Sequence, residues 1–369
     1  MRRLLLLSAS AGAGHLRAAE AVEKAWKGKG EARHVDVLSL APALFRRAYS
    51  RGYLDLVDRA PGMLGLLYDR TNRPPKGKAG DALRLLVDRL NTRRLEDLLE
   101  EFRPDVVCHT HFLPAEVLGR LRRKGRLDVP QAVVVTDFDV HRFWLCPGTD
   151  LYLVAREDCR IHLQALGVPP GRIRVTGIPV DPAFAEKPNL PALRRKHGVE
   201  EGLPLLLLLA GGFGVGPVED LLKRLRRELR GARIAVIAGR NEALRERLAR
   251  AAKGPGAPAR VLGFTNEMHE WMALASLAVT KPGGLTTSEA LSRGLPLVVV
   301  NPIPGQETRN ATMLYEEGAA ISGENPLTAA SRVARLLSDP GRRAAMRRAA
   351  QGLGRPWAAF DAAEALRAL

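Results

Sequence analysis

The sequence predicts an α/β protein of two domains, each built on a parallel sheet. Its 369 residues are enough for two domains of ordinary size. Short apolar runs alternate with amphipathic stretches almost throughout, and this alternation is typical of βα units. The pattern restarts after a proline-rich stretch near the middle. A composition of 46% hydrophobic and 26% charged residues supplies substantial cores and excludes a disordered or fibrous chain.

In the first half, apolar runs bounded by turn residues predict five strands. They are Arg3–Ser8, Asp105–Thr110, Gln131–Thr136, Leu151–Val154 and Ile173–Thr176. The Gly177–Pro182 stretch, with Pro188 and Pro191 after it, suits a linker because proline ends regular structure. We therefore expect an N-terminal domain over residues 1–185 and a C-terminal domain over residues 186–369.

The second half repeats the alternation with five strands and four helices. The strands are Leu205–Ala210, Arg233–Ala238, Arg260–Leu262, Leu277–Thr280 and Pro296–Val300, and the helices lie near 217–230, 241–252, 285–293 and 307–317. No apolar run approaches the roughly 18 residues of a transmembrane helix. Arg2 and Arg3 before Leu4–Leu7 imitate a signal peptide, but four leucines are too few, and a buried first strand explains them better.

The charge is strongly basic, with 57 Lys and Arg against 40 Asp and Glu, a net +17. This favours a polyanion, an anionic membrane or a phosphate-bearing substrate. The alternative is a coding bias toward arginine, which supplies 46 of the 57 basic residues. Cys108, Cys146 and Cys159 lack CxxC spacing, which predicts a reducing compartment and no zinc site.

Residues 41–95 combine 12 basic and 5 acidic side chains with interleaved Leu, Phe, Tyr and Met. Such a segment suits the interface of an anionic bilayer, where arginines meet headgroups and apolar groups enter the acyl region. The alternative is an ordinary pair of helices packed on the first sheet.

The first candidate functional motif is a small-residue turn, Ser8 to Gly14, followed by His15. Small residues let a ligand approach the backbone where a strand gives way to a helix. In the first helical turn, the helix dipole disfavours a charged imidazole and keeps His15 a neutral base near pH 7. The turn lacks the Lys-Ser/Thr of a P-loop and the full GxGxxG spacing, which disfavours NTPase and dinucleotide functions.

Two further glycine-rich turns follow strands of the second half. Gly211-Gly212-Phe213-Gly214-Val215-Gly216-Pro217 offers backbone N–H groups that suit phosphate oxygens. The run from Lys281 to Glu289 contains Pro282-Gly283-Gly284, and the next loop carries Gln306 and Glu307. Donors for an anion and acceptors for hydroxyls at the carboxyl edge of one sheet favour a nucleotide sugar. The alternative is that both glutamates only complement helix dipoles.

These motifs together resemble the family of monogalactosyldiacylglycerol synthases and processive diacylglycerol glucosyltransferases, relatives of the peptidoglycan N-acetylglucosaminyltransferase. The resemblance rests on Gly12-Ala13-Gly14-His15, on Lys281 to Glu289 and on Pro304-Gly305-Gln306-Glu307. It implies the GT-B fold, two facing Rossmann-like domains, with the donor held by the C-terminal domain and the lipid acceptor by the N-terminal one. It also implies that the last helix crosses back to the first domain.

The resemblance assigns roles to individual residues, with His15 as the catalytic base. Phe264 would border the uracil, Glu289 would bind the ribose, and Gln306 with Glu307 would bind the hexose. The diphosphate would be surrounded by Gly211, Gly212, Phe213, Gly214, Gly283 and Gly284. The other donor-binding residues would be Gly14, Pro282, Leu285 and Thr286. Asp137, His141 and Trp144 would serve the acceptor site or the structure around it. Asp137-Phe138-Asp139 imitates the metal-binding DxD of another glycosyltransferase fold, but we expect neither a metal nor another cofactor.

The expected function is an inverting transfer of glucose or galactose from a UDP-sugar to diacylglycerol, at the cytoplasmic face of the cell membrane. The alternative is N-acetylglucosaminyl transfer to a polyprenyl-pyrophosphate cell-wall precursor. A basic nucleic-acid-binding protein is the alternative of another class, and it is disfavoured because no recognisable binding module or single basic block is present. The expected partners are therefore a UDP-hexose, diacylglycerol and an anionic membrane surface, and not nucleic acid.

Overall fold

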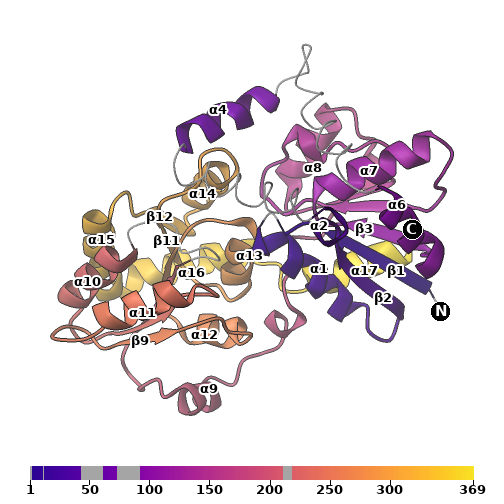
Figure 1. Ribbon diagram of the computed structural model, residues 1–369. Helices are drawn as coiled ribbons and strands as arrows, with labels where there is room; N and C mark the ends of the chain where they lie inside the picture. The colour runs from indigo at the N-terminus through magenta and orange to yellow at the C-terminus, as the bar shows by residue number, and fades with distance from the viewer. Residues whose placement is uncertain (1, 11, 43–60, 73–91, 211–217) are drawn as a thin grey trace. The chain divides into compact units, whose positions relative to one another are not determined.

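A computed structural model describes residues 2–10, 12–42, 61–72, 92–210 and 218–369. The chain forms two compact units (Figure 1). The first comprises Met1–Pro182, Pro304–Gln306 and Trp357–Leu369, and the second comprises Ala183–Ile303 and Glu307–Pro356. No helix of the described residues is long and apolar enough to cross a membrane.

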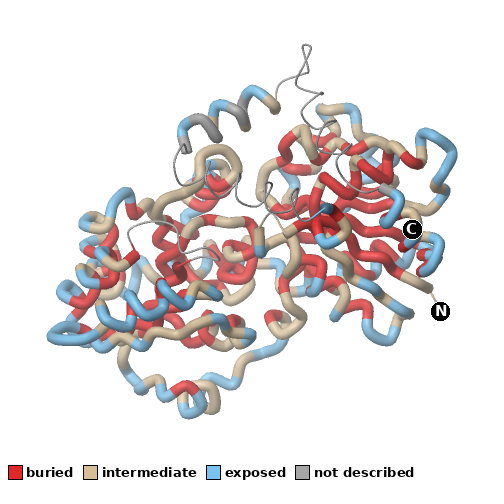
Figure 2. Tube along the Cα trace, in the orientation of Figure 1, coloured by how far each residue is buried: buried red, intermediate tan, exposed pale blue. Residues whose placement is uncertain are grey.

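The first unit is built on a six-stranded parallel sheet of order β2-β1-β3-β4-β5-β6. Its strands are β1 (Arg2–Ser8), β2 (Gly30–Asp36), β3 (Val106–His109), β4 (Gln131–Val134), β5 (Leu151–Val154) and β6 (Ile173–Val175). The four leucines of β1 are fully buried, because helices cover both faces of the sheet (Figure 2). On one face Leu4 and Leu6 pack against Val22, and on the other Leu5 and Leu7 pack against Leu113 and its neighbours.

Helices of the first unit connect these strands or flank the sheet. They are α1 (Ala13–Ala25), α2 (Val37–Leu40), α4 (Pro61–Thr71), α6 (Thr92–Phe102), α7 (Phe112–Arg123), α8 (Glu157–Ala165) and α17 (Ala358–Arg367), with short 3₁₀ turns η1 (Arg142–Trp144) and η2 (Pro170–Arg172). A third 3₁₀ turn, η3 (Pro182–Phe184), spans the boundary between the two units in the sequence. The last helix, α17, packs its alanine-rich face on α1 in the core of the first unit.

The second unit contains a six-stranded parallel sheet of order β12-β11-β10-β7-β8-β9, the strand order of the Rossmann fold. Its strands are β7 (Leu205–Leu209), β8 (Arg233–Ile237), β9 (Ala259–Leu262), β10 (Leu277–Thr280), β11 (Leu297–Val299) and β12 (Ala320–Ser322). Its helices are α9 (Leu190–His197), α10 (Val218–Glu228), α11 (Glu242–Ala251), α12 (Met268–Leu274), α13 (Gly284–Ser292), α14 (Gln306–Glu316), α15 (Pro326–Ser338) and α16 (Pro340–Leu353).

The ten strands expected from the sequence are present, and two edge strands were missed. Strand β2 carries polar side chains that are at most partly buried, and β12 has only three residues. Neither shows the continuous apolar run that marks a strand buried on both faces. Most of residues 41–95, for which we expected membrane contact, lies outside the described residues, as does the Gly211–Pro217 turn.

Candidate active site

His15 lies at the carboxyl edge of the first sheet, after β1. The strand order changes side at β1, because β2 lies on one side of it and β3 on the other. Strands β1 and β3 are neighbours, but the helices that follow them, α1 and α7, pack on opposite faces of the sheet. Open α/β sheets bind ligands at the strand ends where such a divergence occurs. Gly12 is the N-cap of α1, so His15 projects from the first helical turn.

Two contacts fix the ring of His15. Its Nδ1 lies 2.8 Å from the carbonyl oxygen of Thr110 and 3.0 Å from the hydroxyl of Thr136, residues that follow β3 and β4. A carbonyl oxygen only accepts hydrogen bonds, so Nδ1 carries the proton and donates it to Thr110. The neutral ring therefore keeps its lone pair on Nε2. That is the tautomer that a general base requires.

The surroundings of His15 favour its neutral form. Burial lowers the pKa of His15 to about 4, and the hydrogen bond to Thr110 opposes only part of this shift. The ring of His111 meets it edge-on, with 4.6 Å between centroids. Burial and the neighbouring His15 also hold the pKa of His111 well below its usual range. Both imidazoles are thus neutral at pH 7.

The three residues expected around the acceptor lie in one stretch after β4. Trp144 is buried, with its ring 6.2 Å from that of His15. His141 is also buried, and both of its nitrogens are engaged: Nδ1 accepts the N–H of Phe143 and Nε2 donates to the Tyr68 carbonyl at 3.0 Å. These bonds give His141 a structural task, tying α4 to η1. Asp137 is half-buried, and Asp139 lies 3.4 Å from His162.

The second unit places the Pro282–Gly284 turn between β10 and α13. Gly283 is the N-cap of α13 and offers no side chain to the first N–H groups of the helix. These donors and the helix dipole favour an anion at this end. Asn310, fully buried, holds the turn by donating from Nδ2 to the Pro282 carbonyl at 3.0 Å. Leu285 is buried behind it and Thr286 is half-buried.

Glu307 stands beside this turn in the first turn of α14, directly after Gln306. Its Oε2 accepts the N–H of Ile303 at 2.7 Å, and its Oε1 lies beside Gly283, 3.5 Å from where a Cβ would stand. Burial raises the pKa of Glu307, while the Ile303 N–H and the charge of Lys281 oppose the rise. A small cavity at the carboxyl ends of β7, β10 and β11 is lined in part by Ala210, Lys281 and Asn301.

The predicted uracil and ribose residues differ in exposure. Phe264, after β9, is 49% exposed, and the guanidinium of Arg240, after β8, lies 4.4 Å from the centre of its ring. Glu289 is only 1% exposed, one turn inside α13. Gly211, Gly212, Phe213 and Gly214 lie outside the described residues. Five of the predicted sugar-donor-binding residues, Pro282 to Thr286, are consecutive in the sequence. The fold places Glu307 beside them.

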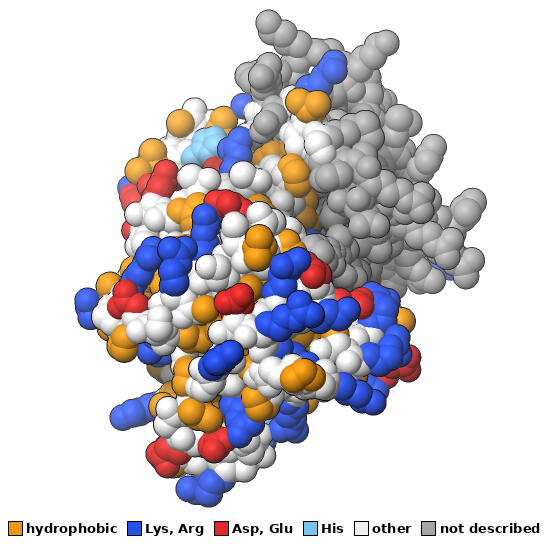
Figure 3. All heavy atoms as spheres, turned by 90° about the vertical axis from the view of Figure 1, so that its left-hand side faces the viewer, with side chains coloured by type: hydrophobic (Ala, Val, Ile, Leu, Met, Phe, Trp, Pro, Cys, Tyr) orange, Lys and Arg blue, Asp and Glu red, His pale blue; other side chains and the backbone are white. Residues whose placement is uncertain are grey.

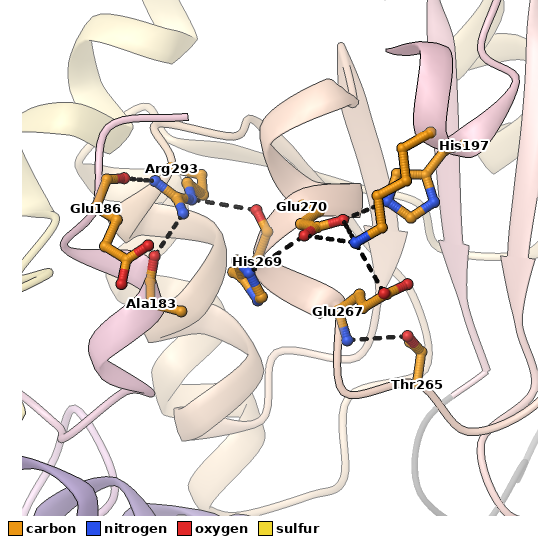
Figure 4. Close-up of polar contacts among 9 residues, drawn as sticks. Ala183, Glu186, His197, Thr265, Glu267, His269, Glu270 and Arg293 are labelled. Atoms are coloured by element: carbon orange, nitrogen blue, oxygen red, sulfur yellow. Dashed lines mark hydrogen bonds and ion pairs between the residues drawn. The ribbon is translucent and has the colours of Figure 1, made fainter. Parts of the chain in front are cut away.

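Another polar cluster lies between α9 and α12 (Figure 4). In the described part of the chain, His197, Glu267 and Glu270 form the one group of three such residues whose ligand atoms are near enough to share a metal ion. The Lys196 ammonium already lies 2.9 Å from Glu267 and 2.7 Å from Glu270. The cluster is therefore a set of ion pairs that joins the two helices. Nearby, Arg293 donates to three backbone carbonyls, those of Ala183, Glu186 and His269.

Sequence reasoning missed the partners that orient the predicted residues. Thr110 and Thr136 follow strands, but 95 and 121 residues separate them from His15, and no local pattern announces the contact. Arg240 and Asn310 also lie on loops or helices after strands of the second sheet. Strand order, which sequence periodicity does not supply, was the missing information.

Comparison with known proteins agrees with this geometry. Residues 15–180 match the family "Monogalactosyldiacylglycerol (MGDG) synthase", and residues 193–352 match "Glycosyl transferases group 1". The chain is 31% identical to the processive diacylglycerol beta-glucosyltransferase of Bacillus subtilis over 252 residues, 68% of this chain and 65% of that protein. The match thus spans slightly under two thirds of that relative's length. The enzyme of the same name from Bacillus mycoides is 27% identical over 365 residues, 96% of this chain and 90% of its own.

Solved structures show the same fold. MurG of Acinetobacter baumannii has a TM-score of 0.63 at 17% identity, with all of both chains covered. The UDP-GlcNAc 2-epimerase of Neisseria meningitidis has the same TM-score at 13% identity, also over all of both chains. With its two parallel Rossmann-like sheets, this is a protein of the GT-B fold class. The chain belongs to the family of monogalactosyldiacylglycerol synthases and processive diacylglycerol glucosyltransferases.

Proposed function

We propose that this chain is an inverting glycosyltransferase that moves glucose or galactose from a UDP-sugar to the free hydroxyl of diacylglycerol. The observation that carries the proposal is the tautomer of His15, whose Nε2 lone pair is available because Nδ1 donates to Thr110. The names of the relatives and the anion-favouring turn before α13 support the choice of substrates.

In the proposed reaction, His15 Nε2 takes the hydroxyl proton while the acceptor oxygen bonds to the anomeric carbon of the sugar. The bond from that carbon to the diphosphate breaks, and UDP leaves with both electrons. The N–H groups before α13 and the Lys281 side chain would stabilise the charge that develops on the diphosphate. Glu289 would bind the ribose, Phe264 would border the uracil, and Gln306 with Glu307 would bind the hexose.

A lipid acceptor implies work at a membrane surface. We propose that the chain acts as a peripheral protein on the cytoplasmic face of the cell membrane, with residues 41–95 in contact with anionic lipid. Nucleic acid has no place in this function. Asp137 and Trp144 would lie close to the acceptor, with His141 shaping that site through its bonds to α4 and η1.

Radiolabelled donors test the proposal directly. Wild-type protein is incubated with UDP-glucose, UDP-galactose or UDP-N-acetylglucosamine over vesicles that contain diacylglycerol or a polyprenyl-pyrophosphate acceptor, and the lipids are then resolved. We expect label from one of the two hexoses in a glycosyldiacylglycerol. Transfer of only N-acetylglucosamine, and only to a polyprenyl-pyrophosphate acceptor, would instead support the second candidate, which the MurG-like fold favours by architecture alone.

A further inference from the structure

Three stretches of the chain carry a clear excess of basic residues. Residues 41–95 have an excess of seven basic residues. Residues 326–356 hold seven arginines and a single acidic residue, Asp339. Residues 221–260 hold twelve basic and three acidic residues. Of the three stretches, residues 326–356 have the highest ratio of basic to acidic side chains, seven to one, and they are called the second block below.

The second block forms the helical hairpin α15–α16 of the second unit. The inner face of α15, which includes Ala329, Ala330, Val333 and Leu336, packs in the core with α10. Asp339 is used as the N-cap of α16, where its carboxylate accepts the N–H of Arg342 at 2.9 Å. The only acidic side chain of the block therefore has a structural task.

Three of the arginines also have structural partners. Arg332 pairs with Glu324 at 2.6 Å, and Arg343 donates to the Leu336 carbonyl at the end of α15. Arg347, on α16, is half-buried. The other helical arginines, Arg335, Arg342 and Arg348, are exposed. No carboxylate among the described residues forms an ion pair with these three. Their charge faces solvent without compensation.

Several other exposed positions of the hairpin carry small side chains. Its exposed positions on α16 include Gly341, Ala344, Ala345 and Gly352, so the arginines stand among small residues. At the start of α15, Leu327 is 59% exposed. Figure 3, which faces the side of the second unit where α15 and α10 lie, shows Lys and Arg in several groups there. Exposed arginines, small residues and an exposed leucine together suit an anionic bilayer, where cations meet headgroups and an apolar side chain enters below them.

We propose that the α15–α16 hairpin is a second contact with the anionic membrane surface, on the donor-binding unit and separate from residues 41–95. The partner is a lipid bilayer rather than nucleic acid, because the surface has an exposed leucine and no aromatic side chain for stacking on bases. The proposal rests on the proposed function to the extent that a lipid acceptor brings the protein to a membrane.

The test measures binding of the full chain to sedimented vesicles at moderate salt. Vesicles contain phosphatidylcholine alone or with phosphatidylglycerol. The variant R335E/R342E/R348E reverses the three exposed charges, and K187E/R195E/R250E makes the same net change at exposed positions of the second unit outside the hairpin. A basic residue near an anionic surface strengthens binding about fivefold. We therefore expect the hairpin variant to lose at least tenfold in binding to phosphatidylglycerol vesicles, and the control variant less than threefold.

Equal losses in the two variants would show that only net charge matters and would overturn the proposal, as would no loss in either. If the hairpin variant loses affinity for duplex DNA but keeps its affinity for vesicles, the surface is a nucleic-acid site and the proposal is wrong. Should the reversals unfold the hairpin, R335Q/R342Q/R348Q provides the milder change, with at least a fivefold loss expected. Transfer to diacylglycerol dispersed in uncharged detergent should be unaffected in each variant. Failure of the wild type in that detergent assay counts against the proposed function and not against the membrane contact.

Discussion

The chemistry assigned to His15 depends on bonds made by the other nitrogen of its ring. Nδ1 is held by the Thr110 carbonyl, and burial keeps the ring neutral, with a pKa of about 4. Such a base is weak but is already deprotonated at pH 7, and it is oriented by the backbone rather than by a carboxylate. Efficient proton transfer then depends on the transition state, in which the acceptor oxygen becomes more acidic as it bonds to carbon.

Removing the imidazole should affect catalysis much more than donor binding. We predict that His15→Ala lowers kcat by about two to four orders of magnitude, the usual contribution of a general base. Steady-state kinetics with UDP-glucose or UDP-galactose provide the measurement, and calorimetry with UDP provides the control. A matching loss of UDP affinity would make His15 a donor contact and would place the base elsewhere.

Glu289 should matter for the nucleotide and not for folding. Because it is buried, the isosteric Glu289→Gln is the suitable change, since it removes the charge and leaves the volume. We predict a loss of roughly 1–3 kcal/mol in UDP binding by calorimetry, from one charge-assisted hydrogen bond. Glu246→Gln, at an exposed position of α11, is the matched control. If both variants bind UDP as the wild type does, Glu289 is not the ribose ligand.

The sequence predicts His15 as the base but not the residues that would hold it in the form a base requires. A histidine after a small-residue turn is visible locally, whereas Thr110 and Thr136 reach it only because β1, β3 and β4 lie side by side. The same holds for Asn310, whose bond to Pro282 crosses from α14 to the turn before α13. Side-chain partners supplied by neighbouring strands follow from strand order, which apolar patterning leaves open.

Among the elements, α13 has the largest part in the proposed donor site. Its N-cap, Gly283, offers no side chain to the first N–H groups of the helix, so these would be available to a ligand. Its C-cap, Arg293, donates to the carbonyls of Ala183 and Glu186 at the start of the second unit. Its N-terminal donors would take over the task that a divalent cation performs for diphosphate leaving groups in other enzymes.

Sugar transfer should therefore persist when divalent cations are removed. We predict that saturating EDTA leaves at least half of the wild-type rate in the radiolabel assay. Lys281→Ala, which removes a cation beside the donor turn, should in contrast lower the rate about tenfold or more. Loss of activity in EDTA that magnesium or manganese restores would require Asp137 and Asp139 to be reconsidered as metal ligands.

Element prediction succeeded where both faces of a strand are buried. The run Leu205–Leu209 is buried throughout, and its apolar composition predicts the strand, whereas β2, at the edge of its sheet, carries several polar side chains. The four helices expected in the second half match α10, α11, α13 and α14 within about two residues at each end. Burial on two faces leaves a strong compositional signal, and an edge position weakens it.

Across the whole molecule, buried neutral histidines make stability depend on pH. Burial lowers the pKa values of His15 and His109 to about 4, against 6.5 in an unfolded chain. Between these values the unfolded state binds more protons, so the first unit is fully stabilised above pH 6.5 and loses stability as the pH falls toward 4.

Thermal unfolding should reveal this linkage. Between pH 7 and pH 5 each of the two histidines should cost about 2 kcal/mol, which lowers the midpoint by several degrees. His109→Asn should remove about 2 kcal/mol of this pH dependence and leave the contributions of His15 and of His111, whose pKa burial also lowers. UDP binding to the second unit should be unchanged. A midpoint that is independent of pH over this range would contradict the assignment of neutral, buried rings.

The central claim is a single displacement at the anomeric carbon, assisted by His15 acting on the acceptor hydroxyl. The configuration of the product tests it most directly, because a UDP-hexose carries an α-linked sugar and a single displacement inverts that centre. Glycolipid made by the wild-type protein from UDP-glucose or UDP-galactose and diacylglycerol is purified, and the coupling of its anomeric proton is measured by NMR. We predict a β-linked hexosyldiacylglycerol. An α-linked product would contradict direct displacement and with it the role given to His15.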